Sequence, residues 1–377
     1  MKILYVIKKL EYGGAEFQLL AIAGRQRKLG HSVKIVTLNI PDPYFLEWVK
    51  EADLDYQCVG LDSFSQLPAA LVRLRKAITQ YRPDVVHSHM YHSNILTRLI
   101  YLTWKRAVFI STAHNIREGS EFRDWLYRIT DPFCNVTTNV SRAAVDRYNA
   151  DGLVRNHACE LIENGVDTDK FRHNKPARQE YRHQMSSDDR FIWLYVGSLT
   201  EQKDLPNLLQ AFSRIAQHAA NPHLYIVGDG PLRTTVSALI STLDIENQVT
   251  LLGNRNDLVE CYSMADGFAL GSAWEGLPIV LLEALSCSLP AVATDVGGNS
   301  DLVVDGKHGY LAAPQNPTSL AEKMQRLMEL SAQDRQSFSE QARSHIVKNY
   351  DLGVIAARWR DLYLRPHKHL STRKADS

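Results

Sequence analysis

The sequence has 377 residues, of which 45% are hydrophobic and 23% charged, and its formal net charge at pH 7 is +1. This length and composition predict a soluble protein of two domains, and the near-neutral charge argues against nucleic acid as a partner. The five cysteines stand in no C-x-x-C spacing and no run approaches the 18 apolar residues of a membrane span, so free thiols and a cytoplasmic location are expected.

Predicted strands and helices alternate along the first part of the chain. Residues 2–7 are typical of a strand, a loop with Gly13 and Gly14 follows, and a helical pattern runs to about Leu29. Further predicted elements are a strand at 32–38, a helix at 67–81, a strand end at 84–87, and strands at 108–112, 137–139 and 158–162. This alternation predicts a parallel sheet covered by helices on both faces.

A second series of the same kind begins after a polar stretch. Residues 172–190 are charged and lack apolar periodicity, so we place a boundary there, between an N-terminal domain of residues 1–172 and a C-terminal domain of residues 173–350. Strands are predicted at 191–196, 224–227, 249–252, 267–270 and 291–294. Two doubly wound halves predict ligand sites at the carboxyl ends of the strands.

The glycine loop after the first strand is a candidate phosphate site. Backbone N–H groups around Gly13 and Gly14, at the start of a helix, can cradle a phosphate; a plain tight turn is the alternative. The loop is not G-x-G-x-x-G, and the second strand ends without an acidic residue for a ribose. Both departures oppose a nicotinamide-dependent oxidoreductase, which is the least favoured of the functions considered.

The strongest local signal is the pair Glu275 and Glu283, with seven residues between them at a predicted strand-to-helix junction. Gly276 and Pro278 suit the start of that helix. Glu283 lies in a run of Ile, Val, Leu and Ala, where a carboxylate needs partners to offset the cost of burial. The two O–H groups of a diol can be such partners; a salt bridge or a helix cap is the alternative.

At these residues the sequence resembles the donor-site motif of retaining GT-B glycosyltransferases, above all glycosyltransferase family 4. Other short segments resemble that family in the same order along the chain: GGAE at 13–16, HSH at 87–89, TAH at 112–114, NGVD at 164–167, VGSL at 196–199 with Lys203, and VGDG at 227–230. The resemblance implies an α/β protein with two Rossmann-like domains facing a cleft. It also implies that a helix at about residues 351–364 packs back on the N-terminal domain.

The implied reaction is transfer of a sugar from a nucleotide diphosphate sugar to a saccharide or polyprenyl-linked acceptor, with no cofactor and no metal ion. Glu283 would hold the nucleotide ribose, and Glu275 would hold donor-sugar hydroxyls. Lys203 would neutralise the diphosphate, and His114 would lie beside the reacting sugar; His114, Lys203 and Glu275 are thus the implied catalytic residues. The remaining donor-binding positions are Gly13, Gly14, Ser198, Gly228, Gly230, Arg255, Gly276, Leu277, Pro278 and Ile279.

Ser198 departs from the family pattern, which has an arginine at this position. The donor diphosphate then lacks one of two expected cations, for which Arg233, Arg255 or Lys307 could substitute. The same departure keeps a second function open, that of a nucleotide-sugar binder without catalytic activity.

Three features could suggest a metal site or a membrane surface. His87, His89 and His92 are clustered, but His87 and His89 are expected on opposite faces of their strand, and the D-x-D patterns at 53–55 and 167–169 lie away from the donor motif. We therefore expect no metal site. A basic group comprises Arg73, Arg75, Lys76, Arg82, Lys105 and Arg106. It is either a solvated helix face or a contact with an anionic membrane or lipid diphosphate acceptor.

Overall fold

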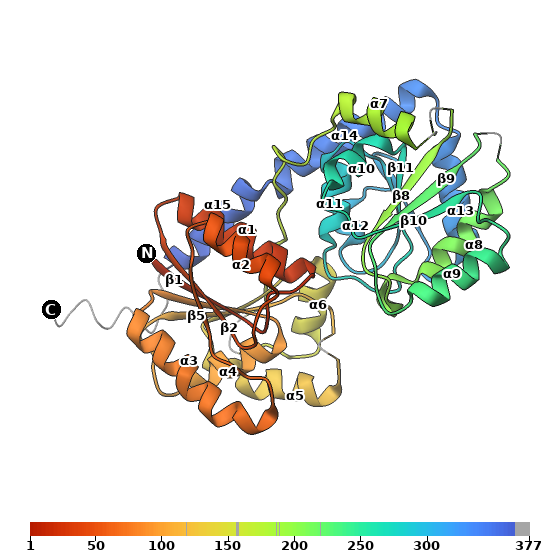
Figure 1. Cartoon of the computed structure of the whole chain (residues 1–377). Coiled ribbons are helices and arrows are strands. Elements are labelled where there is room, and N and C mark those ends of the chain that lie inside the picture. Colours follow the sequence, from red (N-terminus) through yellow and green to blue (C-terminus); the bar gives the residue numbers. More distant parts are fainter. Residues whose placement is uncertain (118, 156–157, 186, 188, 219, 366–377) are drawn as a thin grey trace. The chain divides into compact units, whose positions relative to one another are not determined.

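The computed structural model describes residues 1–117, 119–155, 158–185, 187, 189–218 and 220–365. The chain divides into two compact units: unit 1 comprises Met1–Gly165 and Leu352–Ser377, and unit 2 comprises Val166–Asp351. Each unit has its own parallel β-sheet with helices on both faces (Figure 1). The prediction of two doubly wound α/β halves is thus confirmed.

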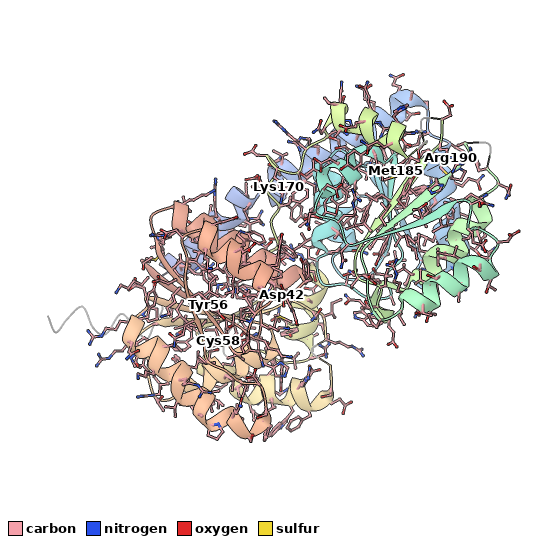
Figure 2. All side chains as sticks on the ribbon, in the orientation of Figure 1. Asp42, Tyr56, Cys58, Lys170, Met185 and Arg190 are labelled. Carbon is pink, nitrogen blue, oxygen red and sulfur yellow. The ribbon has the colours of Figure 1, made fainter. Side chains whose placement is uncertain are left out.

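In its described part, unit 1 has a seven-stranded sheet in the order β3-β2-β1-β4-β5-β6-β7. The strands are β1 Lys2–Ile7, β2 Ser32–Thr37, β3 Asp55–Cys58, β4 Val85–His89, β5 Val108–Ala113, β6 Val136–Asn139 and β7 Glu160–Leu161. The central strand β1 pairs in parallel with β2 and β4. Tyr56 and Cys58 lie on the outer strand β3 (Figure 2). The hydroxyl of Tyr56 lies 2.9 Å from Oγ1 of Thr37 on β2.

Two core clusters lie on the two faces of this sheet. The helices of unit 1 are α1 Gly14–Lys28, α2 Pro43–Glu51, α3 Leu67–Tyr81, α4 Tyr91–Tyr101, α5 Glu121–Thr130, α6 Arg142–Ala150 and α15 Leu352–Leu364, with short 3-10 helices at Phe64–Gln66 and Asp131–Phe133. Ile3 and Tyr5 pack with α1, α2 and α15, whereas Leu4 and Val6 pack with α3 and α4. Alternate residues of β1 therefore serve opposite faces, as the period of two in a strand requires. From α15, Trp359 is 4% exposed within the first cluster.

In its described part, unit 2 has a six-stranded sheet in the order β10-β9-β8-β11-β12-β13. The strands are β8 Ile192–Val196, β9 His223–Val227, β10 Val249–Gly253, β11 Gly267–Leu270, β12 Ala291–Thr294 and β13 Gly309–Ala312. The central strand β8 is buried throughout and pairs in parallel with β9 and β11. A Cβ on Gly267 would lie 2.6 Å from the Trp193 ring, so glycine lets the two strands pack closely.

The helices of unit 2 cover both faces of this sheet (Figure 1). They are α7 Lys175–Gln184, α8 Leu205–Ile215, α9 Arg233–Thr242, α10 Leu258–Met264, α11 Ile279–Ser286, α12 Asn299–Leu302, α13 Pro317–Met328 and α14 Ala332–Tyr350, with a 3-10 helix at Glu201–Lys203. Helix α8 packs against α13 and α9, α10 packs against α7, and α11 packs against α14 and α12.

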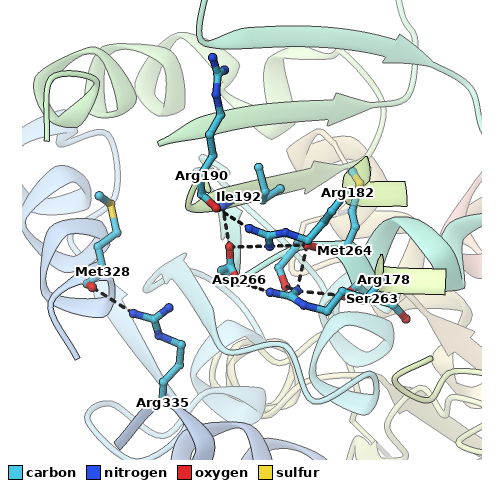
Figure 3. A network of polar contacts seen from close by, with 10 residues as sticks. Arg178, Arg182, Arg190, Ile192, Ser263, Met264, Asp266, Met328 and Arg335 are labelled. Carbon is cyan, nitrogen blue, oxygen red and sulfur yellow. Dashed lines mark hydrogen bonds and ion pairs between the residues drawn. The ribbon is translucent and has the colours of Figure 1, made fainter. Parts of the chain in front are cut away.

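Helix α7 lies in the stretch for which the sequence predicted no element. Its attachment is polar: Arg178 donates from Nη1 to the three carbonyls of residues 263–265, and from Nη2 to Asp266 Oδ1 (Figure 3). Arg182 donates to Asp266 Oδ2 at 3.0 Å, and the amide of Ile192 donates to the same oxygen at 2.8 Å. Because arginines rather than apolar side chains dock this helix, hydrophobic periodicity could not reveal it.

The division between the units falls after Gly165, earlier than the predicted boundary at 172. The intervening segment is bonded to α14 of unit 2. The amide of Val166 donates to Tyr350 O at 2.9 Å, and Arg343 donates to the carbonyls of Thr168 and Phe171, both at 3.1 Å. These bonds join residues far apart in the sequence, so composition alone placed the boundary too late.

Candidate functional site

A buried ion pair lies beyond the carboxyl ends of β8 and β11 in unit 2. Nζ of Lys203 is 2.6 Å from Oε1 of Glu275, and the two side chains are only 14% and 4% exposed. Lys203 ends the 3-10 helix that follows β8, and Glu275 lies between β11 and α11. Two of the three implied catalytic residues are therefore brought together by strands that neighbour one another in the sheet.

Further donors surround the Glu275 carboxylate. Ser272 Oγ donates to Oε1 at 2.7 Å, and Gln202 Nε2 donates to Oε2 at 3.2 Å. These donors and the counter-cation replace the water shell that the buried carboxylate gives up. The arrangement holds a negative charge in a fixed position beside a lysine that has two further N–H groups to donate.

The backbone between Glu275 and α11 is fixed by a second glycine loop. Gly297 has a φ of +55°, and a Cβ there would lie 2.0 Å from the carbonyl oxygen of Glu275. The amide of Gly298 donates to Gly276 O at 2.7 Å. Pro278 is the N-cap of α11, so the predicted positions Gly276, Leu277, Pro278 and Ile279 form the entry to this helix. A helix N-terminus attracts anions, and this one begins beside Glu275 and Lys203.

Glu283 projects from α11 and is partly exposed. Tyr262 of α10 donates its hydroxyl proton to Oε2 of Glu283 at 2.8 Å. Burial raises the pKa of Glu283 to about 7, against the opposing effects of this hydrogen bond and of the positive charge of Lys170. No partner of Oε1 is found in the described part of the chain. Oε1 can therefore accept from a ligand, and the role of Glu283 as the acceptor of a diol stays a prediction.

The other glycines assigned to the donor site pack two loops together. A Cβ on Gly228 would lie 2.0 Å from Gly197 O, and one on Gly230 would lie 2.6 Å from Leu199 O. Ser198, between these two loop residues, is exposed, and its hydroxyl lies 3.4 Å from Oγ1 of Thr200. This close packing is a sufficient reason for glycine at both positions, and no ligand is needed to explain them. It also places Ser198 on the surface of the loop that leads to Lys203.

Of the three cations considered as substitutes for the missing arginine, Arg255 is already paired. It donates from Nε to Asp257 Oδ1 at 2.7 Å and also from Nη2 to Oδ2. Arg233 lies 3.4 Å from Asp229 Oδ2, in a pair whose side chains are 44% and 45% exposed. A Cβ on Gly253 would lie 4.0 Å from Nη1 of Arg233, so this arginine lies at the carboxyl end of β10. Lys307 is exposed in the loop before β13.

In unit 1, the glycine loop after β1 holds a carboxylate of the chain itself. Gly13 is the N-cap of α1, with a φ of −168°, and a Cβ on it would lie 2.4 Å from Oε2 of Glu16. Glu16 is 5% exposed, and burial raises its pKa to about 7, helped by the charge of Glu11. The side chain therefore lies at the helix N-terminus where the sequence predicted a phosphate. The end of the Glu16 side chain packs against Gly13, a contact that the sequence did not suggest.

Three histidines of unit 1, His87, His89 and His114, form a cluster. The expectation that His87 and His89 point to opposite faces was wrong, because alternate residues of a strand share a face. Their ring centroids are 4.1 Å apart. His89 Nδ1 lies 3.0 Å from His114 Nε2, and His87 contacts Tyr363 of α15 at 2.8 Å and Thr112 of β5 at 2.6 Å. Burial lowers the pKa of His114 to about 4, so its ring is neutral near pH 7.

A cavity of about 400 Å³ adjoins α7, and a second, of about 300 Å³, lies at the carboxyl ends of β1, β4 and β5 in unit 1. The second cavity is lined by Lys8, Lys9, Glu11, Glu16, Met90, Tyr91, His92, Asn115, Arg117, Gly119 and Arg123. It lies at the strand ends where ligands of doubly wound sheets bind. His92 lies here, whereas His87 and His89 are inside the protein.

Neither D-x-D pattern forms a cluster of carboxylates. Asp53 pairs with Arg27, and Asp167 Oδ1 accepts from the amides of Asp169 and Lys170. Within the described ranges, no group of three or more His, Cys, Asp or Glu side chains could hold a metal ion. None of the helices in those ranges is long and apolar enough to cross a membrane.

Sequence reasoning missed several residues at these sites. Ser272, Gln202 and Tyr262 bond the two donor-motif carboxylates, and Glu16 and His89 accompany Gly13 and His114. Glu16 and His89 stand in the segments GGAE and HSH that carried the resemblance, so a signal existed for them. Ser272, Gln202 and Tyr262 are polar residues at ordinary loop or helix positions, and nothing in the sequence indicated that they contact the donor motif.

Comparison with known proteins follows the same division of the chain. A model described as "Glycosyltransferase Family 4" matches residues 12–170, and one described as "Glycosyl transferases group 1" matches residues 177–345. The UDP-Gal:alpha-D-GlcNAc-diphosphoundecaprenol alpha-1,3-galactosyltransferase of Escherichia coli is 26% identical over 78% of this chain and 79% of its own length. The alpha-D-kanosaminyltransferase of Streptomyces kanamyceticus is 28% identical over 78% and 80%. An uncharacterized glycosyltransferase of Methanocaldococcus jannaschii is 26% identical over 64% and 66%.

Solved structures show the fold. Anabaena HepE in complex with UDP matches 96% of this chain and 99% of its own with a TM-score of 0.85 at 21% identity. The lipopolysaccharide outer core galactosyltransferase WaaB matches 96% and 98% with a TM-score of 0.74 at 17% identity. The GT-B prediction is thus confirmed, and with family matches in both halves this chain belongs to the group 1, family 4 glycosyltransferases.

Proposed function

We propose that this protein is a retaining, metal-independent glycosyltransferase that moves a sugar from a nucleotide diphosphate sugar to a saccharide or polyprenyl-linked acceptor. The observation that carries the proposal is the buried pair of Lys203 and Glu275 next to the N-terminus of α11, with Glu283 further along the same helix. A cation and a helix N-terminus suit a diphosphate, and two fixed carboxylates suit the hydroxyls of a sugar and a ribose.

Each polar side chain of the site in unit 2 is assigned a role that suits its hydrogen-bonding groups. Lys203 keeps two N–H groups beyond its contact with Glu275, and these can donate to diphosphate oxygens. Glu283 offers one oxygen beside the Tyr262 contact, which suits a diol. Glu275 would accept from donor-sugar hydroxyls. In this scheme Ser198 contributes a hydroxyl where the family has a cation. Arg233 is the better placed substitute, because its 3.4 Å pair with Asp229 is exposed, whereas Arg255 is held by Asp257 through two hydrogen bonds.

The names of the relatives support a nucleotide-sugar donor. One is named for UDP-Gal, another is a GDP-mannose-dependent mannosyltransferase of Mycolicibacterium smegmatis, and HepE has been solved with UDP-glucose. Two are named for acceptors linked to diphosphoundecaprenol, the second from Campylobacter jejuni. The nucleotide base and the sugar differ between these names. The names therefore support a nucleotide sugar as the donor, and experiment has to determine which base and which sugar this protein uses.

In the proposed reaction the protein positions the reactants and stabilises the departing diphosphate. Lys203 and the amides at the start of α11 would stabilise the charge that develops on the leaving group. The departing phosphate oxygen would help to deprotonate the acceptor hydroxyl on the same face of the sugar, which gives retention. His114, neutral near pH 7, would contact the sugar by a hydrogen bond without adding a charge.

A panel of nucleotides and nucleotide sugars, measured by thermal shift and then by product release, tests the proposal. A ligand at about 100 times its Kd stabilises the folded state by about 2.7 kcal/mol. We expect stabilisation by one nucleotide diphosphate and its sugars, followed by release of free nucleotide diphosphate when acceptor is added. Binding without release would indicate a non-catalytic binder. Stabilisation by NADH alone would indicate an oxidoreductase.

A further inference from the structure

Two loops of unit 1 carry a pair of exposed, stacked tyrosines. Tyr12, in the loop after β1, is 62% exposed, and Tyr44, in the first turn of α2, is 42% exposed. Their ring centroids are 5.5 Å apart and their ring planes differ by 19°. The fully buried Phe45 supports both rings edge-on, with centroids 5.5 Å from Tyr12 and 5.3 Å from Tyr44. We call Tyr12 and Tyr44 the tyrosine platform.

Backbone hydrogen bonds hold the two loops of the platform together. The amide of Asn39, after β2, donates to Lys8 O, after β1, at 2.8 Å. The amide of Asp42 donates to Leu10 O at 2.9 Å. Asp42 (Figure 2) is also the N-cap of α2, and its Oδ1 accepts from the amide of Tyr44 at 3.0 Å. Because the loops are already fixed, a ligand that binds the platform has little ordering of the chain to offset.

The platform combines apolar rings with polar atoms that have no partner. Within the described ranges, no hydrogen bond is found for the hydroxyl of Tyr12, the hydroxyl of Tyr44 or the second carboxylate oxygen of Asp42. A pyranose ring has a matching surface, since its axial C–H groups form an apolar face and its hydroxyls form a polar rim. A hydrocarbon chain would cover the rings but would leave the three polar groups unpaired.

The platform lies on the other side of β1 from His114. Strands β2 and β4 pair with opposite edges of β1, and β5, which ends next to His114, pairs with β4. With neighbouring strands about 4.8 Å apart, the end of β2 is about 14 Å from the end of β5. Glu11, which precedes Tyr12, lines the 300 Å³ cavity at the ends of β1, β4 and β5. One sugar ring cannot span this distance, whereas a chain of sugars that leads from the cavity to the platform can.

We propose that the tyrosine platform binds a pyranose unit of an oligosaccharide acceptor, at a subsite separate from the unit that receives the sugar. This role rests on the proposed sugar transfer, and it narrows the acceptor to a saccharide of two or more units. One face of the pyranose packs on the tyrosine rings, and its hydroxyls bond Asp42 and the phenolic groups. Single exposed aromatic residues are ordinary, but a stacked pair on fixed loops at the strand ends marks a surface for recognition.

The length of the acceptor tests the proposal. Using the full chain and its donor, kcat/KM is measured with maltotriose, cellotriose and chitotriose and with the methyl glycosides of their single sugars. We expect the wild type to prefer a trisaccharide to its monosaccharide. Tyr12→Ser with Tyr44→Ser should lower the ratio of the two kcat/KM values about tenfold, the size of an aromatic contact.

Two further variants separate the rings from other effects of substitution. Tyr12→Phe with Tyr44→Phe keeps the rings and should retain most of the preference for the trisaccharide. The matched control Phe64→Ser removes a ring that is 88% exposed elsewhere in unit 1, and it should keep the wild-type ratio. Because the substituted side chains are exposed, all of these variants should keep the wild-type Tm.

A binding measurement without donor separates the platform from the transfer reaction. Saturation-transfer NMR of the same trisaccharides should show contacts to the C–H protons of a sugar ring that the double serine variant loses and Phe64→Ser keeps. Such binding without turnover would refute the proposed function and leave the platform in place. Turnover with the same ratio in the wild type and the double serine variant, or no binding of any trisaccharide, overturns the platform. An equal loss with a prenyl diphosphate acceptor that carries one sugar would also overturn it, by assigning the rings to the lipid.

Discussion

Lys203 Nζ lies 2.6 Å from Glu275 Oε1, so the cation assigned to the diphosphate and the carboxylate assigned to the sugar are in direct contact. The pair gives each group a partner in a buried place, where an isolated charge would be costly. It also couples them, because a change to one alters the charge that the other experiences.

The first prediction concerns Glu275→Gln. We expect this variant to keep its affinity for the bare nucleotide diphosphate, because Lys203 loses a competing acceptor but remains in place. Turnover with the full donor should fall severely, since sugar contacts also act in the transition state. Calorimetric titration with the nucleotide and kcat/KM with the donor measure the two effects. A loss of nucleotide affinity as large as that of Glu283→Gln would contradict the assignment of the two carboxylates.

The second prediction concerns Glu283→Gln, which should weaken bare nucleotide and full donor alike. Hydrogen bonds to a charged group contribute about 1.5–3 kcal/mol, which is roughly 10- to 150-fold in affinity. Since burial raises the pKa of Glu283 to about 7, a diol must also displace its proton below that pH. Affinity of the wild type should therefore fall as the pH drops below about 7, relative to Glu283→Gln at each pH. Parallel pH profiles of the two proteins would argue against Glu283 as the ribose ligand.

The third prediction concerns His114→Ala, which should lower turnover far more than it weakens binding of the bare nucleotide. His114 belongs to unit 1, while the residues assigned to the nucleotide belong to unit 2. His89→Ala should lower kcat in the same direction, because it removes the ring that lies 3.0 Å from His114 Nε2 and orients it. Steady-state kinetics and calorimetry on both variants provide the comparison. Equal losses in kcat and in nucleotide affinity would place His114 elsewhere.

The fourth prediction concerns stability and Glu16. Burial raises the pKa of Glu16 to about 7 from 4.5, so the unfolded chain releases this proton at lower pH than the folded one. The folded state therefore loses stability as the pH rises from about 4.5 to about 7. Glu16→Gln keeps the volume and removes the titration, so it should be more stable than the wild type by about 1–3 kcal/mol at pH 8 and equal to it at pH 4.

Urea unfolding of Glu16→Gln and wild type at several pH values measures this difference. Glu51→Gln, at an exposed position at the end of α2, is the matched control and should follow the wild type throughout. A difference between Glu16→Gln and wild type that does not change with pH would show that the carboxyl group of Glu16 is not perturbed.

The fifth prediction is that turnover survives chelation. Lys203 and the N-terminus of α11 would stabilise the negative charge on the departing diphosphate, which a divalent ion does in other phosphate chemistry. Activity after treatment with EDTA should equal activity before it, and added manganese or magnesium should change it little. Loss of turnover in EDTA that either ion restores would refute the prediction.

The sequence by itself determined the two doubly wound halves, the two carboxylates of the donor motif and most of the strands, although it did not predict β3 and β13. Apolar runs have to be buried, and strands that alternate with helices have to pair in parallel, so this information is local. The sequence predictions that were wrong or missing also had local causes. The period of two was misapplied to His87 and His89, and α7 escaped because arginines attach it to Asp266.

Only the tertiary structure decided which side chains meet. Lys203 is 72 residues from Glu275 in the chain, yet neighbouring parallel strands deliver both to one edge of a sheet. Glu16 fills the helix N-terminus that the glycine pattern suggested for a phosphate, a contact set by the turn at Gly13. Residue types and spacing restrict what a site can do, but the desolvation and the partners that set its charges exist only once distant segments pack together.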